Sequence, residues 1–447
     1  MSKSIRINTV MQLGTPRQRR LWTLLGFGLA SSAAAFCGFF VAKGDSKIFN
    51  RSNQVIIARD GNRSVFTMMN DYQGSAKDFA RIVPIPVVPR REDIRIGDPS
   101  IVKKLDAYSA PRLVEYFDEN PCAPSVMFDM AMPSASAPAP ASAQARANAL
   151  GVKIEASYQV GEYDIAILSA SQQTGLATYL RGEGYRLPPG ADTMLGGYLR
   201  SGMKFFVVRV NMERFDASGG GFLNPIVLSY TSEKFMLPIR LGTLNSPGEQ
   251  DLTVYLLSPQ GRIETSNYRT AAMPTDKEVP MLVKNQFAPF YRHVFRRAYE
   301  REGKNVALLE YAWNTNTCDP CSSEPPTSAE LREAGVFWRQ QEGFSAPTSG
   351  AIVPTPEGEA KPVFLTRLHV RYTAATFPED LHFKVTPNQN TFQGRYILRH
   401  PYKGGGSCAA LNTYKADLKR RNEAQAQTLA NLTGWDINHI RQRMAQE

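Results

Sequence analysis

An uncharged run near the N-terminus most constrains where this chain can fold. The run extends from Leu21 to Ala42, contains 22 residues and follows a segment with three closely spaced arginines. A basic segment, an apolar segment and then three small alanines at 33–35 form the pattern of an export signal. We therefore predict that residues 1–35 are a signal peptide, which is cleaved between Ala35 and Phe36.

The same run has an alternative interpretation as a membrane anchor. At 1.5 Å per residue, 22 residues are long enough to cross a hydrocarbon core of about 30 Å. An uncleaved anchor over residues 21–42 is therefore the alternative to a cleaved signal. The start of translation is also open, because Met11 follows Met1 before the run begins. The expected location is the periplasm or cell envelope in either case.

Charge and length limit the classes of function. The 447 residues carry a net charge of +11, and removal of the five basic residues in 1–35 leaves +6 for the rest of the chain. Sites that bind nucleic acid concentrate basic residues in dense patches with exposed aromatic residues. This mild and dispersed excess predicts no nucleic-acid partner. The length allows one large domain or two to three ordinary ones.

Two polar stretches divide the chain. Residues 123–150 are rich in Ala, Pro and Ser, and they contain too little apolar surface to offset the entropy of ordering. They are predicted to form a disordered or extended linker, and residues 341–362 a polar loop. These stretches separate an N-terminal β-rich part at 36–122, a central α+β body at 151–340 and a final part at 363–447 with a strand and helices.

Runs of β-favouring residues dominate the remaining sequence. Two such runs that flank a turn predict a hairpin, at 53–72 about Asp60-Gly61-Asn62, at 152–169 about Gly161, and at 251–268 about Pro259-Gln260-Gly261. Further strands are expected at 205–210, 226–230, 235–241 and 306–313.

Prolines modify the expectations for two segments. Residues 79–88 contain Pro84 and Pro86, and proline cannot donate a hydrogen bond to a neighbouring strand. This segment is therefore expected to form an edge strand or to end early. Residues 109–117 are expected to form a short helix with Pro111 in its first turn.

Helical signals are fewer. Thr327 and Glu330 match a capping box that opens a short helix. Apolar periodicity predicts an amphipathic helix at 174–183 and two helices in the tail at 411–444, with a break at Thr433-Gly434. Together these signals predict an α+β fold with an antiparallel β-rich body, several hairpins, short interspersed helices and a helical C-terminus.

The run at 364–372 alternates between apolar and charged residues. Arg367, His369 and Arg371 share one face, and apolar side chains share the other. Since side chains alternate across a strand, the run predicts a half-buried strand whose three charged residues face water.

Five cysteines bear on the compartment and on stability, namely Cys37, Cys122, Cys318, Cys321 and Cys408. Disulfides are expected in an exported chain. Five cysteines form at most two bridges, and about 15 arrangements of that kind are open. The favoured arrangement is a local bridge between Cys318 and Cys321, with one long-range bridge among the other three.

The motif Cys318-Asp319-Pro320-Cys321 has two further chemical interpretations. It follows a strand, as in thioredoxin, but Pro325 and Pro326 oppose the helix that would stabilise a thiolate there. A zinc site would need two more ligands. The candidates by pattern are His369, His382, His400 and Cys408. A structural bridge is favoured over both, so no metal or cofactor is predicted. The motifs HExxH, GxSxG and GxxxxGK[ST] are absent from the sequence, and no catalytic residue is assigned.

Several blocks resemble one bacterial family. They are Cys37–Lys43, Asn70–Gly74, Phe79–Val88, Leu105–Tyr116, Gly202–Phe206, Phe235–Gly242, the CDPC motif and Phe392–Tyr396. Together these blocks resemble the family called domain of unknown function 2330, with residues 123–150 as an insertion. The resemblance implies an exported bacterial protein with an N-terminal signal and no assigned biochemical activity, so it transfers no catalytic residue.

The expected function is a non-enzymatic binding or structural protein of the bacterial envelope, whose partner is an unknown envelope protein or ligand. The alternative is an envelope enzyme, either a thiol–disulfide oxidoreductase that uses Cys318 and Cys321 or an unrecognised hydrolase whose triad assembles from distant positions. Membrane association through residues 21–42 is expected only if that segment is not cleaved.

Overall fold

The structure is a computed structural model that describes residues 39–43, 49–50, 53–70, 72–73, 79–123, 152–170, 175–217, 223–245, 248–339 and 361–446. All of these residues belong to one compact unit, Ser32–Glu447. The predicted signal peptide with its cleavage site lies outside the described residues, as do nearly all of the predicted linker at 123–150 and the polar loop at 341–362.

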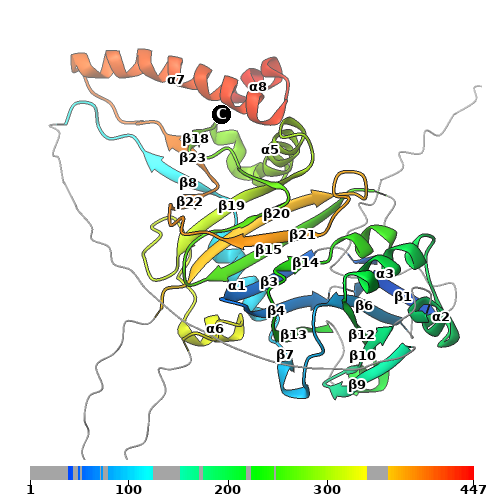
Figure 1. Cartoon of the computed structure of the whole chain (residues 1–447). Coiled ribbons are helices and arrows are strands. Elements are labelled where there is room, and N and C mark those ends of the chain that lie inside the picture. The colour runs from blue at the N-terminus through cyan, green and yellow to red at the C-terminus, as the bar shows by residue number, and fades with distance from the viewer. Residues whose placement is uncertain are drawn as a thin grey trace, which may run out of the picture. The chain divides into compact units, whose positions relative to one another are not determined.

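Two large sheets form the centre of the described structure (Figure 1). The first is antiparallel throughout and has the order β11 (Tyr185–Arg186), β1 (Phe39–Lys43), β6 (Phe79–Ile85), β12 (Lys204–Val210), β10 (Tyr163–Ala170), β9 (Val152–Val160). The second has nine strands, in the order β17 (Arg269–Ala272), β19 (Val306–Asn314), β20 (Phe364–Tyr372), β15 (Gln250–Ser258), β3 (Asn53–Asp60), β4 (Arg63–Asn70), β13 (Leu223–Thr231), β7 (Ile94–Ile96), with β22 (Phe392–Gln393) paired to β19. Its pairs are antiparallel except for β15 with β3 and β17 with β19.

Small sheets and helices surround these two sheets. The small sheets are β14 (Met236–Leu237), β21 (Leu381–Val385) and β16 (Ile263–Thr265); β18 (Lys277–Glu278), β23 (Arg395–His400) and β8 (Arg112–Phe117); and β2 (Phe49–Asn50) with β5 (Tyr72–Gln73). The α-helices are α1 (Ser100–Ser109), α2 (Gly175–Gly182), α3 (Ala191–Arg200), α4 (Met212–Ala217), α5 (Phe287–Arg301), α6 (Ser328–Glu333), α7 (Ala409–Thr433) and α8 (Ile437–Met444). Short 3-10 helices are η1 (Arg91–Asp93), η2 (Arg240–Asn245) and η3 (Met281–Gln286). The predicted α+β fold with a mostly antiparallel, β-rich body and a helical C-terminus is confirmed.

The main core lies between the two large sheets. Alternate residues of β3, β4, β13 and β15 pack against alternate residues of β6, β10 and β12. A strand has two distinct faces because its side chains alternate. Strands β3 and β15 are nevertheless buried over most of their length, since their outer faces are covered as well.

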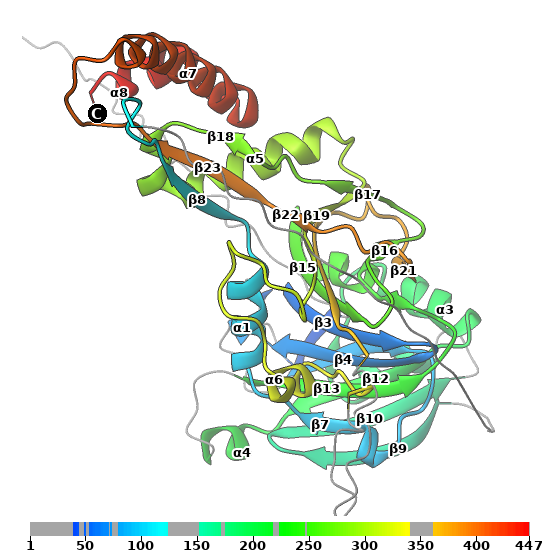
Figure 2. The same cartoon turned by 90° about the vertical axis from the view of Figure 1, so that its left-hand side faces the viewer.

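Helices cover the outer faces of both sheets (Figure 2). Helices α2 and α3 pack on the six-stranded sheet, for example through Leu180 and Leu195. Helices α1 and α6 pack on the nine-stranded sheet beside Tyr255 and Tyr311, and α5 packs on the same sheet beside Leu308. The nine-stranded sheet therefore lies between another sheet and a layer of helices.

Two of the three predicted hairpins are confirmed. Strands β3 and β4 pair antiparallel down to Asp60 opposite Arg63, and strands β9 and β10 pair antiparallel down to Val160 opposite Tyr163. The turns place Gly61 at φ +55° and Gly161 at φ +54°. Only glycine adopts such angles without a steric penalty, which explains the turn signal in the sequence.

The third predicted hairpin, at 251–268, is wrong. Its two runs form β15 and β16, but β15 pairs with β3 and β20, whereas β16 pairs with β21. The turn instead leads the chain from one sheet to another. It needs Gly261 because a Cβ atom there would lie 2.7 Å from the carbonyl oxygen of Asn388.

The proline-containing segments differ from prediction. Strand β6 ends at Ile85, as expected, but it lies between β1 and β12 rather than at an edge. Pro84 lies opposite Phe205 of β12, and it lies beyond Ile82, the last residue of β6 that pairs with β1 in the described part of the chain. The predicted helix at 109–117 is instead the strand β8, which follows the end of α1. Ala110 is extended (ψ 145°) because it precedes Pro111.

The other helical predictions are confirmed. Helix α6 begins with the Thr327–Glu330 capping box, α2 occupies the predicted amphipathic segment, and the tail forms α7 and α8. Gly434 ends α7 at φ +76°. The predicted strand at 235–241 is reduced to β14, after which the chain forms η2. No helix in the described part of the chain is both long and apolar enough to span a membrane.

Candidate functional site

A β-bulge in β19 creates the most unusual charged site of the described structure. Leu309 pairs with Leu368 and Tyr311 pairs with Arg367, so Glu310 is an extra residue in β19. A bulge of this kind redirects a side chain, and bulges are frequent beside functional sites. Here it directs the Glu310 side chain into the layer between the nine-stranded sheet and α5, where only 1% of the residue is exposed.

Three donors surround the Glu310 carboxylate. The Tyr291 hydroxyl of α5 donates to Oε1 at 2.5 Å, Arg367 Nε donates to Oε2 at 2.6 Å, and His369 Nδ1 lies 2.8 Å from Oε1. Burial alone would raise the pKa of Glu310, but the charges of Arg367 and His369 outweigh it and lower the pKa to about 2. Glu310 is therefore a buried anion across the ordinary pH range.

His369 lies between two carboxylates. Its Nδ1 faces Glu310, and its Nε2 lies 3.3 Å from Oδ1 of Asp251. The ring of Phe295 stacks on it with a centroid distance of 3.8 Å. Burial opposes the positive charge, yet the two carboxylates outweigh burial and raise the pKa of His369 to about 9. Asp251 in turn receives two hydrogen bonds from Arg371, each of 2.8 Å.

Arg367 connects this cluster to α1. Its Nη1 donates to Asp106 of α1 at 2.7 Å, and its guanidinium lies over the ring of Tyr255, whose hydroxyl donates to the same Asp106 carboxylate. The cluster of Asp106, Asp251, Glu310, Arg367, His369 and Arg371, called the ionic row below, thus runs across the helix-covered face of the sheet from α1 to α5.

The prediction that Arg367, His369 and Arg371 face water is therefore wrong. The strand alternates as expected, but α1 and α5 cover its polar face, and only 8% of Arg367 is exposed. Every cation of the ionic row has a carboxylate partner, and His369 is held as a cation on both ring nitrogens. This arrangement holds strands and helices together, whereas a general base would need a free nitrogen lone pair.

The CDPC motif forms an ordered loop after β19. Asp319 is buried, and its Oδ2 accepts hydrogen bonds from the Tyr311 hydroxyl at 3.0 Å and from Gln393 Nε2 at 2.8 Å. Its Oδ1 accepts the backbone N–H of Cys321 at 3.1 Å. No helix begins at the motif itself, in agreement with the prolines at 325–326. The next helix, α6, begins only after these prolines.

Both cysteines of the loop are free thiols, so the local bridge that the sequence favoured is not formed. Cys318 is exposed, and Cys321 is partly buried beside Arg395, whose Nη1 donates to Sγ at 3.5 Å. Asp319 and Arg395 contact the second cysteine, from the loop and from β23, while the first cysteine is exposed.

The disulfide of the described structure joins Cys122 and Cys408 across 286 residues of sequence. It is one of the long-range pairings that the spacing left open, and it connects the segment after β8 to the start of α7. Cys37 lies outside the described residues.

The zinc hypothesis receives no support from these positions. Cys408 is already in the disulfide, His369 is held by Glu310 and Asp251, and His400 contacts Glu115 at 2.6 Å. In the described ranges no cluster of three or more His, Cys, Asp or Glu side chains is placed to hold a metal ion.

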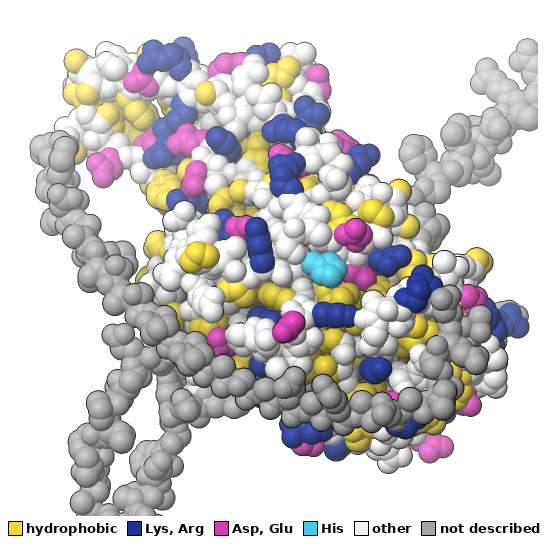
Figure 3. Space-filling view, viewed as in Figure 1, with side chains coloured by type: hydrophobic (Ala, Val, Ile, Leu, Met, Phe, Trp, Pro, Cys, Tyr) yellow, Lys and Arg dark blue, Asp and Glu magenta, His cyan; other side chains and the backbone are white. Residues whose placement is uncertain are grey.

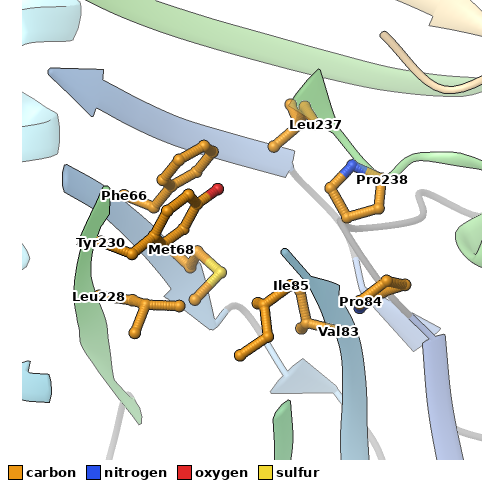
Figure 4. Close-up of a pocket in the computed structure, with 9 residues that line it drawn as sticks. All are labelled: Phe66, Met68, Val83, Pro84, Ile85, Leu228, Tyr230, Leu237 and Pro238. Carbon is orange, nitrogen blue, oxygen red and sulfur yellow. The ribbon is translucent and has the colours of Figure 1, made fainter. Parts of the chain in front are cut away.

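An apolar pocket between the two large sheets offers no chemistry. Its cavity volume is about 10 Å³, which leaves room for no more than about one water molecule. Figure 4 shows its nine lining residues, Phe66, Met68, Val83, Pro84, Ile85, Leu228, Tyr230, Leu237 and Pro238. The Tyr230 hydroxyl is the titratable group in that lining, and burial raises its pKa well above the ordinary value of a tyrosine.

The outer edge of β8 is an open strand edge. Strand β8 ends its sheet, and in the described part of the chain no strand pairs with its other side (Figures 1 and 2). The N–H groups of Arg112 and Asp118 donate to Gly394 and His400 beside β23. Because neighbouring residues alternate in direction, the N–H and C=O groups of Leu113, Glu115 and Phe117 face outward.

Two aromatic side chains stand at this edge. Tyr116 is 41% exposed and Phe117 is 70% exposed, and they are among four large hydrophobic residues exposed in the described part of the chain. Phe117 stacks on His400 with a centroid distance of 4.3 Å, and Arg399 lies over the Tyr116 ring. In Figure 3, hydrophobic side chains reach the surface near β8 and α7, among charged ones.

Sequence reasoning missed Glu310 and assigned no role to β8. The missed signal for Glu310 is its position as the one charged residue in the apolar run at 306–313. The edge position of β8 has no local signal, because it depends on pairing with β23 some 280 residues later.

The comparisons with known proteins give one match. No curated protein sequence and no solved structure matches this chain. The profile of a bacterial family, described as "Uncharacterized protein conserved in bacteria (DUF2330)", matches residues 31–384. The match extends over well over half of the chain and includes β8, the CDPC motif and the ionic row. The chain therefore belongs to the DUF2330 family of bacterial proteins.

Proposed function

We propose that this protein is an exported component of the bacterial cell envelope that binds an extended segment of another protein along the outer edge of β8. The observation that carries this proposal is the open edge of β8 with Tyr116 and Phe117 exposed beside it. An open edge offers unpaired N–H and C=O groups, which a further strand can satisfy.

The side chains around β8 support an ordered docking surface. Glu115 is held by Lys284 at 2.7 Å and by His400 at 2.6 Å, and Phe117 stacks on that same histidine. These contacts hold the edge in an extended conformation before any partner arrives. A preorganised edge loses less conformational entropy on binding than a mobile one.

Export is supported by two independent features. The N-terminal sequence has the pattern of a signal peptide, and the described structure contains the Cys122–Cys408 disulfide. Disulfides persist in oxidising compartments such as the bacterial periplasm and are rare in the cytosol.

A binding role is favoured over hydrolysis because of the state of the ionic row. His369 is the histidine best surrounded by acids, but both of its ring nitrogens face carboxylates and Phe295 covers it. A hydrolase would need such a histidine beside a free nucleophile. The thiol–disulfide alternative rests on Cys318 and Cys321, which are free in this structure.

Strand addition is tested by photo-crosslinking in intact cells. A photoreactive phenylalanine analogue replaces Tyr116 in the full chain, in combination with either Glu115→Ala or Glu115→Pro. Both substitutions remove the contacts of Glu115 with Lys284 and His400, but only proline removes the outward N–H. We expect a protein adduct that persists with Glu115→Ala and disappears with Glu115→Pro. An adduct of equal yield in both variants, or no adduct in either, would overturn the proposal.

Export is tested by mass spectrometry of the mature protein and by alkylation of thiols in intact cells. We expect an N-terminus at Phe36, and alkylation before reduction should leave Cys122 and Cys408 unlabelled. A chain that begins at Met1 or Met11 would restore the anchor alternative, and labelled Cys122 and Cys408 would place the protein in a reducing compartment.

A further inference from the structure

We propose that Cys318 and Cys321 form a reversible dithiol–disulfide couple, which exchanges electrons with an exposed disulfide of another molecule. The proposal does not depend on strand addition along β8. It rests on the exposure of one sulfur, the cation beside the other and the fixed backbone between them.

The two thiols occupy different environments. Cys318 is exposed and open to a large reactant, whereas Cys321 is partly buried. Arg395 donates from Nη1 to the Cys321 sulfur at 3.5 Å, and its Nε donates to Asp276 at 2.5 Å. The bond to Asp276 orients the guanidinium toward the Cys321 sulfur. Cys318 is therefore the sulfur that a large reactant can reach, and Cys321 is the one placed to resolve a mixed disulfide.

Contacts from several segments hold the backbone around both thiols. Asp319 accepts the N–H of Cys321 and is itself held by Tyr311 and Gln393. Arg112 Nη1 donates to the carbonyl oxygen of Cys321 at 3.0 Å, and the following serine hydroxyl donates to the carbonyl oxygen of Tyr108. The Asp319 carboxylate thus fixes the backbone around Cys321 through three hydrogen bonds.

The exchange balances in two steps. The thiolate of Cys318 attacks one sulfur of the co-reactant disulfide, an S–S bond forms to that sulfur, and the other sulfur leaves as a thiolate that takes a proton. The thiolate of Cys321 then attacks the sulfur of Cys318, which closes the Cys318–Cys321 bond and releases the second sulfur of the co-reactant as a thiol. The co-reactant gains two electrons and two protons, and the Cys318–Cys321 pair loses them.

The first test is a redox equilibrium on the full chain in glutathione buffers, read by alkylation and peptide mass spectrometry. Arg395 donates to the Cys321 sulfur of the reduced pair, so Arg395→Met should remove a contact of the reduced form and favour the disulfide. We expect about a tenfold shift of the equilibrium, equivalent to a potential about 30 mV more negative. Arg399→Met is the matched control, because Arg399 lies in the same strand and pairs with Glu278 at 2.8 Å. The control should keep the wild-type equilibrium.

The second test does not require a substitution at Arg395. In Cys321→Ser the resolving thiol is absent, so Cys318 should accumulate a mixed disulfide with its co-reactant in cells, while Cys318→Ser should accumulate less. The mass of the adduct distinguishes a small thiol from a protein. The proposal is overturned if the pair stays oxidised in buffers far more reducing than glutathione, if Arg395→Met and Arg399→Met give the same equilibrium, or if Cys321→Ser carries no mixed disulfide.

Discussion

At the scale of single residues, one carboxylate balances two buried cations. Glu310 contacts both Arg367 and His369, and all three lie in the layer beneath α5. A buried ion pair contributes little net stability compared with apolar side chains of the same volume, but removal of one partner leaves an uncompensated charge. Glu310 is therefore the residue of the ionic row whose loss should cost most.

We expect Glu310→Gln to lower the free energy of unfolding by about 3–5 kcal/mol, because Arg367 and His369 then keep their charges without their shared acceptor. Urea denaturation of the full chain measures this change. Glu423→Gln is the matched control, since Glu423 is exposed and pairs with Arg441 on the surface. Equal midpoints for Glu310→Gln and the control would contradict a role of the ionic row in holding α5 to the sheet.

The same row should give the protein a defined pH range of stability. The pKa of His369 is raised to about 9 in the folded chain, so its contribution is complete below its ordinary value of 6.5 and is lost as the pH rises through 9. The pKa of Glu310 is lowered to about 2, so its contribution is complete above its ordinary value of 4.5 and is lost as the pH falls toward 2. Between pH 5 and about 9, the free energy of unfolding should therefore decrease as the pH rises toward 9. The His369→Gln variant should lose most of this pH dependence. A slope that persists in His369→Gln would assign it to other groups.

At the scale of elements, β8 shows how a strand can have one paired and one open edge. The N–H of Tyr116 faces β23, and the N–H of Phe117 faces outward, as the bonds of Arg112 and Asp118 establish. Both residues are exposed aromatic residues in the same strand. Proline substitution at each position therefore separates the loss of a paired N–H from the loss of an aromatic side chain.

We expect Tyr116→Pro to lower the free energy of unfolding by about 1–3 kcal/mol more than Phe117→Pro, because it removes a hydrogen bond of the sheet and leaves a β23 acceptor unpaired. Thermal and urea unfolding of both variants measure the difference. Equal losses of unfolding free energy in the two variants would mean that the outer edge of β8 is also paired in solution.

Local elements of this fold could be predicted from the sequence where their cause is local. The hairpin turns at Gly61 and Gly161 and the capping box at Thr327 act over a few residues, and each of them is present. The expected hairpin about Gly261 failed because turn chemistry does not determine which sheet the next strand joins. Strand β20 was predicted with the correct alternation and the wrong environment, because nothing near it in the sequence shows that α5 covers its charged face.

The candidate site depended still more on distant contacts. Glu310 could have been noticed as a lone acid in an apolar run, but its partners come from β20 and α5. The environment of the Cys321 sulfur likewise depends on Arg395, 74 residues later in the chain. Residue types indicated which chemistry was available, and only the packing of helices on the sheet decided which groups meet.

At the scale of the whole molecule, one covalent bond joins the segment after β8 to the C-terminal helices. The Cys122–Cys408 bridge joins residues that are 286 positions apart, and the nearby Asp118 accepts hydrogen bonds from Tyr414 and Arg421 of α7. Farther along α7, Ala426, Leu429 and Leu432 pack in the same core as α5. The first half of α7 is therefore held by the bridge and by ionic contacts, and the second half by apolar packing.

This division predicts a local effect when the bridge is removed. A disulfide that closes a long loop restricts the unfolded chain, and its loss typically costs about 2–5 kcal/mol. In the Cys122→Ser/Cys408→Ser double variant we expect a loss of that size, and hydrogen exchange should lose protection over residues 409–421 while residues 425–433 stay protected. Reduction of the wild-type protein should reproduce this pattern. Loss of protection along all of α7 would instead show that the bridge, and not the packing of Leu429 on the α5 core, holds the whole helix in place.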